Sequence, residues 1–131
     1  MSEKPFLWRS RVRFGDTDAS GRIFYTSLLD HFDAAGTEFM RHLGLSYGAL
    51  GDVAFPRVHV ECDYTSPLVF DDLMDIAVTV ERVGRTSFTL AFDVSIDGRN
   101  AARGKLVIVT IDRATQRAIP LPEKLRAALC A

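Results

Sequence analysis

The chain has 131 residues, of which 47% are hydrophobic and 25% charged, a size and composition typical of one globular domain. Sixteen basic and seventeen acidic residues give a net charge of -1, so no large single-sign field is available to bind nucleic acid or an anionic membrane. No segment resembles a signal peptide or approaches the roughly 18 apolar residues that cross a bilayer, and we expect one domain over residues 1–131 without stable membrane insertion.

The cysteines and histidines form no pattern that is typical of a metal site. Cys62 and Cys130 lie far apart, without the close spacing of zinc ligands or the framework of a disulfide-rich protein. His31, His42 and His59 are equally scattered, and we expect His31 and His42 on a polar helix face or at an interface. We therefore expect no metal, no cofactor and a reducing cytoplasm.

The first half of the chain predicts a strand, a turn-rich loop and one long helix. Residues 6–14 mix apolar and basic positions, and the following segment 15–21 is rich in turn-forming residues. Apolar residues with helical spacing predict a helix from Ser27 to Leu43 with a broad apolar face. Thr26 and Ser27 are capping residues at its start, and Gly44 suits a left-handed cap at its end.

The second half of the chain predicts strands. Apolar and polar residues alternate in the runs 58–64, 74–80 and 88–96; residues 105–112 supply a last strand and residues 121–129 a short helix. Turn residues at Ser66-Pro67, Gly84-Arg85 and Asp97-Gly98 predict that consecutive strands pair antiparallel. Only the long helix is large enough to cover such a sheet, so we expect an α+β fold in which a five-stranded antiparallel sheet curls around it.

The loop that leads into the helix is the best candidate for a functional site. Unpaired amides at a helix start carry partial positive charge and stabilise an oxyanion, so a carboxylate in the preceding loop would complete an acyl-transfer site. Asp18 is the candidate carboxylate and the amide near Tyr25 the candidate donor, while Asp16 is expected to hold the loop together through backbone amides. An Asp pair before a helix also serves simply for turns and capping, which is the common alternative.

With these motifs the chain resembles the 4-hydroxybenzoyl-CoA thioesterase family of hotdog-fold proteins. The resemblance covers nearly the whole chain and is carried by residues 14–21, Phe24-Tyr25, the helix, Asp63-Tyr64, Pro67 and residues 85–88. It implies that Asp18 is the catalytic carboxylate and that the Tyr25 amide polarises the thioester carbonyl. It also implies a homodimer or homotetramer with sites at the subunit interface.

The chain departs from this family in ways that bear on the substrate. Many relatives have His in place of Tyr25, which leaves a backbone role intact but changes the surroundings of the acyl group. Arg85 is the main basic residue in a turn that in the 4-hydroxybenzoyl enzymes is more basic and holds the CoA phosphates. Phe24, Asp63, Arg85 and Ser87 are the candidate substrate-binding residues.

The expected function is hydrolysis of an aryl- or short- to medium-chain acyl-CoA, with Asp18 as nucleophile or general base. Two alternatives remain open at this point. One is a thioesterase that acts on thioesters of an acyl carrier protein, and the other is an acyl-CoA binding module without catalysis.

Overall fold

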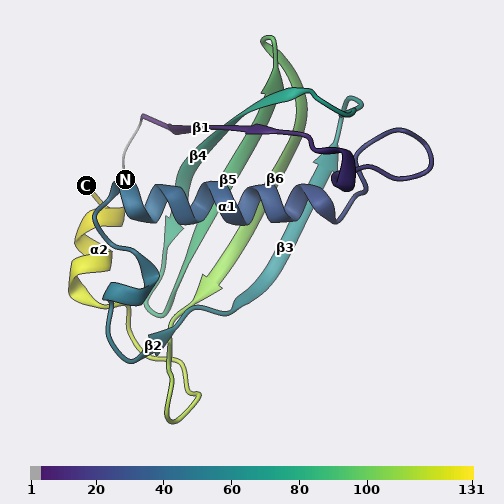
Figure 1. Ribbon diagram of the computed structural model, residues 1–131. Helices are drawn as coiled ribbons and strands as arrows, with labels where there is room; N and C mark the ends of the chain where they lie inside the picture. The colour runs from purple at the N-terminus through teal and green to yellow at the C-terminus, as the bar shows by residue number, and fades with distance from the viewer. Residues whose placement is uncertain (1–3) are drawn as a thin grey trace.

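The computed structural model describes residues 4–131, so residues 1–3 of the predicted domain lie outside the described part of the chain. Five antiparallel strands form one sheet that curves around a single long helix, α1 (Figure 1). The strand order is β1-β4-β5-β6-β3. The strands are β1 (Phe6–Arg11), β3 (Arg57–Tyr64), β4 (Leu73–Val83), β5 (Ser87–Ile96) and β6 (Arg99–Val109). The predicted α+β hotdog architecture is confirmed.

Helix α1 (Ser27–His42) lies where the apolar periodicity predicted it. Gly44 has φ +77° after its last turn, the left-handed conformation that glycine adopts readily. The expected start at Thr26 is also confirmed, but Thr26 has helical dihedrals and its side chain makes no capping hydrogen bond. The helix start therefore keeps unpaired backbone amides.

The sequence predicted that each strand pairs with the next one along the chain, but β3 and β4 do not pair. Strand β3 pairs with β6, whereas β4 pairs with β1 and β5, so the segment around Ser66-Pro67 crosses from one edge of the sheet to the other side. The turn residues predicted a reversal, but β1 occupies the position beside β4 that β3 would have filled. Strands β1 and β3 are thereby left as the two edges of the sheet.

The hairpin between β5 and β6 follows the sequence prediction. Asp97 and Gly98 have φ of +50° and +79° and join Ile96 directly to Arg99, as in a two-residue hairpin turn with positive φ at both positions. Strand β6 consequently begins at Arg99 and not near Lys105 as predicted. The small residues Ala101 and Ala102 are fully buried but gave little hydrophobic contrast in the sequence.

The core lies between α1 and the concave face of the sheet. The rings of Phe32 on α1 and Phe92 on β5 stack with centroids 4.7 Å apart. Gly104 on β6 allows this close approach, because a Cβ atom at that position would lie 2.3 Å from the Phe32 ring. The helix is thus seated directly against the backbone of the sheet.

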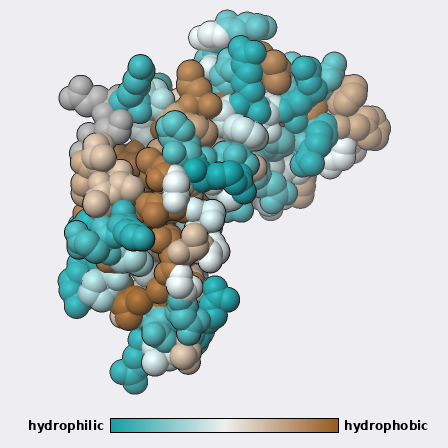
Figure 2. Space-filling model, turned by 60° about the vertical axis from the view of Figure 1, so that its left-hand side comes forward, coloured by the Kyte–Doolittle hydropathy of each residue, from teal (hydrophilic) through white to brown (hydrophobic). Residues whose placement is uncertain are grey.

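Smaller elements close one end of the molecule. They are η2 (Tyr47–Ala49), the paired short strands β2 (Val53–Ala54) and β7 (Ile111–Asp112), and α2 (Glu123–Leu129). Leu125 and Leu129 of α2 are buried in the core. Figure 2 views this end of the molecule, where hydrophobic residues form a band bordered by polar ones.

Candidate active site

The loop before α1 is a compact turn that begins at the short helix η1 (Phe14–Asp16). The Asp18 amide donates to the Arg22 carbonyl oxygen at 3.0 Å, and the Gly21 amide donates to the Asp18 carbonyl oxygen at 3.0 Å. Gly21 has φ +83°, so a residue with a side chain would be strained there. In Figure 1 this loop projects beyond the start of α1, away from the sheet.

The Asp18 carboxylate is exposed and bonded within its own loop through one oxygen only. Its Oδ1 accepts hydrogen bonds from the Ser20 amide at 2.8 Å and from the Ser20 hydroxyl at 2.5 Å. Oδ2 has no hydrogen-bond partner among residues 4–131. The hydroxyl and then the amide of Ser20 hold the pKa of Asp18 below its ordinary value, so the group is a carboxylate near neutral pH.

The Tyr25 amide stands at the start of α1 without an acceptor in the described chain. The preceding Phe24 amide donates to the Asp16 carbonyl oxygen at 2.7 Å, and the Ser27 amide donates to the Phe24 carbonyl oxygen at 2.8 Å. The Thr26 amide, like that of Tyr25, has no acceptor in the described chain. The Tyr64 hydroxyl donates to the Tyr25 carbonyl oxygen, and desolvation raises the pKa of that hydroxyl, so it remains a donor. The Tyr25 amide is therefore an unpaired donor in a segment that is held by hydrogen bonds to Phe24 and to the Tyr25 carbonyl oxygen.

Asp18 and Tyr25 belong to the two sides of one small antiparallel ladder. Thr17 pairs with Ile23, and Asp16 binds Phe24 through the backbone. Asp18 follows Thr17 on one side of this pairing, and Tyr25 follows Phe24 on the other side.

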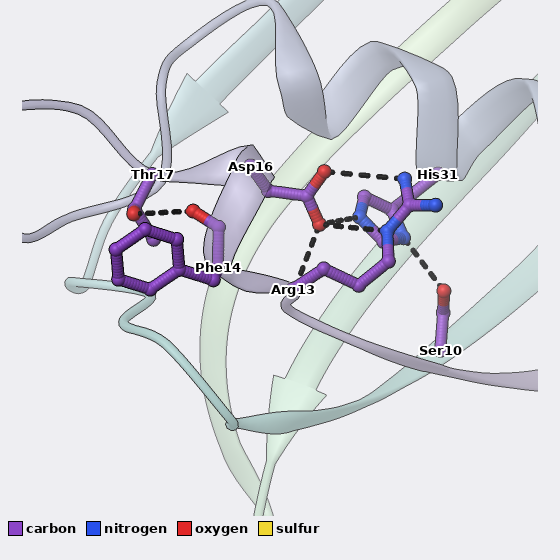
Figure 3. A network of polar contacts seen from close by, with 6 residues as sticks. All are labelled: Ser10, Arg13, Phe14, Asp16, Thr17 and His31. Carbon is purple, nitrogen blue, oxygen red and sulfur yellow. Dashed lines mark hydrogen bonds and ion pairs between the residues drawn. The ribbon is translucent and has the colours of Figure 1, made fainter.

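Asp16 anchors the loop from inside the protein (Figure 3). Its Oδ2 accepts from the Arg13 amide at 2.8 Å and lies 2.8 Å from Nε2 of His31, while the Arg13 guanidinium lies 3.2 Å from Oδ1. Burial disfavours the charged carboxylate, but the hydrogen bonds from Arg13 and His31 outweigh it and lower the pKa of Asp16. Asp16 holds the loop as predicted, through side chains as well as a backbone amide.

His31 does not lie on a polar face or at an interface, as the sequence suggested. It is 4% exposed and lies between Asp16 and Ser10, whose hydroxyl oxygen is 2.6 Å from Nδ1. The prediction was wrong because the buried stripe of α1 is broad enough to include position 31, next to Phe32 and Leu28.

Exposed aromatic side chains surround the loop. Phe24 and Tyr25 meet edge to face with centroids 4.9 Å apart, and Phe14 meets Phe70 in the same manner at 5.8 Å. Phe14 is 77% exposed, far more than a core phenylalanine. Exposed aromatic rings grouped in this way are typical of a binding or contact surface.

The remaining predicted residues do not meet Asp18 within one chain. Asp63 lies on the outer face of the sheet, where it lines a cavity of about 350 Å³ together with Arg103, Lys105 and other charged residues. Arg85 and Ser87 lie at the β4–β5 turn, beside α2. Strand β4 runs from the loop end to this turn, and its 11 residues span up to about 33 Å at 3.3 Å per residue, so Arg85 lies at the far end of the sheet from the loop.

Ser20, His31 and Tyr64 are the residues near the site that sequence reasoning did not single out for these roles. Ser20 follows Asp18 by two positions, the spacing of an Asx-type turn, and this signal was available in the sequence. The pairing of Tyr64 with Tyr25 spans 39 positions and depends on the fold. Among residues 4–131 no group of three or more His, Cys, Asp or Glu residues is placed to hold a metal. No helix in that range is long and apolar enough to cross a membrane.

Several known proteins are similar to this chain in sequence and fold. The sequence profile of the thioesterase-like superfamily matches residues 12–129. A 1,4-dihydroxy-2-naphthoyl-CoA hydrolase from Synechococcus sp. (strain CC9605) is 33% identical over 132 residues, which cover 94% of this chain and 89% of that protein. A solved gentisyl-coenzyme A thioesterase is 31% identical, with a TM-score of 0.86 over 95% of this chain and 99% of that one.

A further solved structure shares the fold. A hypothetical protein from Aquifex aeolicus matches with a TM-score of 0.91 at 24% identity, covering 95% of this chain and 99% of that one. The resemblance inferred from the sequence motifs is thus confirmed. The chain belongs to the thioesterase-like superfamily and is a thioester hydrolase with the hotdog fold.

Proposed function

We propose that residues 1–131 form an acyl-CoA thioesterase domain that hydrolyses aryl-CoA thioesters, with Asp18 as the catalytic carboxylate. The observation that carries this proposal is the Tyr25 amide, an unpaired donor at the start of α1 held in the same loop as Asp18. Asp18 offers one bonded and one unbonded oxygen, so its second oxygen is available to act on a substrate.

In the proposed reaction the thioester oxygen accepts a hydrogen bond from the Tyr25 amide. Either Oδ2 of Asp18 attacks the carbonyl carbon, or it takes a proton from a water molecule that attacks. The negative charge that develops on the oxygen is stabilised by the amide and by the positive end of the helix. The carbon–sulfur bond then breaks and CoA leaves as a thiolate. On the direct route, water hydrolyses the resulting anhydride and restores Asp18.

The acyl group is proposed to be aromatic. Phe24, Tyr25, Phe14 and Phe70 present exposed rings around the loop, and aromatic rings pack favourably on one another. The relatives named above include hydrolases of naphthoyl- and gentisyl-CoA, which both carry aryl groups. Phe24 is the predicted contact closest in sequence to the donor amide.

A second copy of the chain is proposed to complete the site in a homodimer or a homotetramer. Edge strand β3 exposes Val58 and Val60, which are 60% and 48% accessible and have no cover in one chain. Pairing of β3 with its symmetry copy would run antiparallel, and would bring the far end of the partner sheet beside this chain's loop. Arg85 of one chain would then bind the CoA phosphates of a substrate held at the other chain's Asp18.

A panel of thioesters tests this proposal. Purified protein should hydrolyse aryl-CoA substrates faster than alkyl-CoA substrates, measured by release of the CoA thiol. Presenting the same acyl group on an acyl carrier protein separates the two donor classes. Preference for the carrier protein would overturn the CoA assignment, and absence of turnover with every donor would overturn the proposed substrate class.

Isotope labelling distinguishes the two roles of Asp18. In a single turnover in ¹⁸O-labelled water, attack of water on the Asp18 carbonyl carbon of the anhydride places solvent oxygen in the Asp18 carboxylate, and the released acid then carries an oxygen from Asp18. The general-base route never labels the protein, so label in Asp18 identifies the anhydride route.

A further inference from the structure

His31 connects three separate elements inside the protein. From α1 its ring lies 2.6 Å from the Ser10 hydroxyl on β1 and 2.8 Å from the Asp16 carboxylate on η1 (Figure 3). Both His31 and Asp16 are about 5% exposed or less. A polar pair buried this deeply carries a desolvation cost, and an apolar side chain at position 31 would extend the buried face of α1.

Both ring nitrogens of His31 have a hydrogen-bond partner. Nε2 of His31 is the donor to the Asp16 carboxylate, because an ionised carboxylate only accepts, and Nδ1 shares a hydrogen bond with the Ser10 hydroxyl, which can donate or accept. Ser10 thus fixes the orientation of the ring, and the ring fixes the position of Asp16.

Asp16 transmits this position to the start of α1. Its carbonyl oxygen accepts the Phe24 amide at 2.7 Å, and Phe24 is followed by Tyr25, whose amide is unpaired in the described chain. On the other side, Thr17 joins Asp16 to Asp18. The Asp16 main chain is therefore the point from which both proposed reacting groups are held.

We propose that His31 is a positioning residue for the hydrolase, acting through Asp16 on the separation between the Asp18 carboxylate and the Tyr25 amide. This inference rests on the proposed function for its catalytic consequence. Its structural part, the restraint of the Phe24–Tyr25 segment by His31, is independent of any activity. A misplacement of about 1 Å lowers catalysis by up to about 100-fold, so the restraint affects turnover more than substrate binding.

Three variants and a control test this inference. His31→Leu removes both ring hydrogen bonds and keeps an apolar side chain, while His31→Gln retains an N–H donor toward Asp16. Ser10→Ala removes one hydroxyl and leaves the His31–Asp16 contact, which gives a milder variant if His31→Leu does not fold. His42→Leu is the matched control, because His42 lies exposed near the other end of α1.

The first measurement is amide hydrogen exchange, which requires no substrate. In His31→Leu the Phe24 amide should exchange at least about 10-fold faster, while amides in β5 and β6 keep their protection. His31→Gln should restore most of the Phe24 protection, Ser10→Ala should have an intermediate effect, and His42→Leu should match the wild type. Unchanged Phe24 protection in both His31→Leu and Ser10→Ala would overturn the inference, as would an equal loss of protection throughout the sheet.

The second measurement is steady-state kinetics on an aryl-CoA substrate. His31→Leu should lower kcat by about 10-fold or more with KM changed less than about 3-fold, and His31→Gln should recover most of kcat. If His31→Gln and His31→Leu lowered kcat equally, while only His31→Gln kept the Phe24 amide protected from exchange, the restraint of the segment would not affect turnover. If the wild type hydrolyses no thioester, the proposed function fails, while the exchange result still decides whether His31 restrains the segment.

Discussion

The Tyr64 hydroxyl donates a hydrogen bond to the Tyr25 carbonyl oxygen and so joins edge strand β3 to the start of α1. Tyr64 shares its strand with Val58 and Val60, whose exposed side chains form the proposed contact with a second copy. A single hydrogen bond therefore links β3, the proposed contact with the partner, to Tyr25, whose amide is proposed to polarise the substrate. We expect oligomer assembly and catalysis to be coupled.

Placing a charge on the β3 edge tests this coupling. Val60→Asp should dissociate the oligomer, because a carboxylate buried in an apolar contact without a partner carries a large desolvation cost. Turnover should fall with it, since Arg85 of the partner subunit would no longer reach the substrate. Analytical ultracentrifugation and thioesterase assays on the same samples give both quantities.

The opposite edge of the sheet provides the control. Leu7→Asp introduces the same charge at a 66% exposed position on β1 and should leave both assembly and turnover intact. A Val60→Asp monomer with full activity would contradict the proposed shared site.

Ser20 should control the pH at which the enzyme becomes active. Its hydroxyl and amide lower the pKa of Asp18, whose ionised form is the active one. Activity is lost as pH falls through this pKa, so Ser20→Ala, which raises the pKa, should move the acidic limb of the kcat/KM profile to higher pH. Ser20→Thr retains a hydroxyl and should keep the wild-type limb. A limb that stays in place in Ser20→Ala would mean that another group titrates.

Asp16 should contribute to stability in a pH-dependent way. Its folded-state pKa lies below the ordinary value of 3.8, so its contribution is present above about pH 4 and is lost as pH falls through 3.8 toward the folded-state pKa. Asp16→Asn cannot titrate and should flatten the dependence of the free energy of unfolding on pH in this range. Urea unfolding at a series of pH values measures that slope. A slope equal to that of the wild type would contradict the role assigned to the buried carboxylate.

Gly104 should be essential for packing of α1 on the sheet. A Cβ atom there would lie 2.3 Å from the Phe32 ring and 2.8 Å from the Glu61 carbonyl oxygen, and the latter is backbone that cannot move easily. Gly104→Ala should lower the free energy of unfolding by about 1–3 kcal/mol or more, as overpacking does. Gly48→Ala, with no atom within 4 Å of its Cβ, should change it by about 0.5 kcal/mol or less. Similar unfolding midpoints for the two variants would contradict this packing.

Local features of the fold were predictable because they depend on nearby residues. The apolar spacing between Ser27 and Leu43 predicted α1, and Asp97-Gly98 predicted a hairpin that the dihedral angles bear out. The partner of β3 was not predictable in this way. Alternation in residues 58–64 predicts a strand but not its neighbour, and the neighbour β6 lies more than 35 positions further along the chain.

The candidate site was only partly predictable for the same reason. The loop motif with Asp18 and Tyr25 is contiguous, so its residues could be chosen from the sequence. The buried partner of Asp16 is His31 on α1, which in turn is bonded to Ser10 on β1. His31 lies beside the apolar residues of α1 at helical spacing, so the pattern did not mark it as a polar partner of the loop. Arg85 lies at the far end of the sheet, and its proposed role depends on a second chain.

The central claim is that the Asp18 carboxylate carries out the chemical step, and Asp18→Asn tests it most directly. The variant should lower kcat by at least about 100-fold while binding of a non-hydrolysable aryl-CoA thioether, measured by calorimetry, stays within a few-fold of the wild type. Asp97→Asn, a second exposed loop carboxylate, serves as the control and should retain full activity. Turnover of aryl-CoA by Asp18→Asn at the wild-type rate would contradict a catalytic role for Asp18.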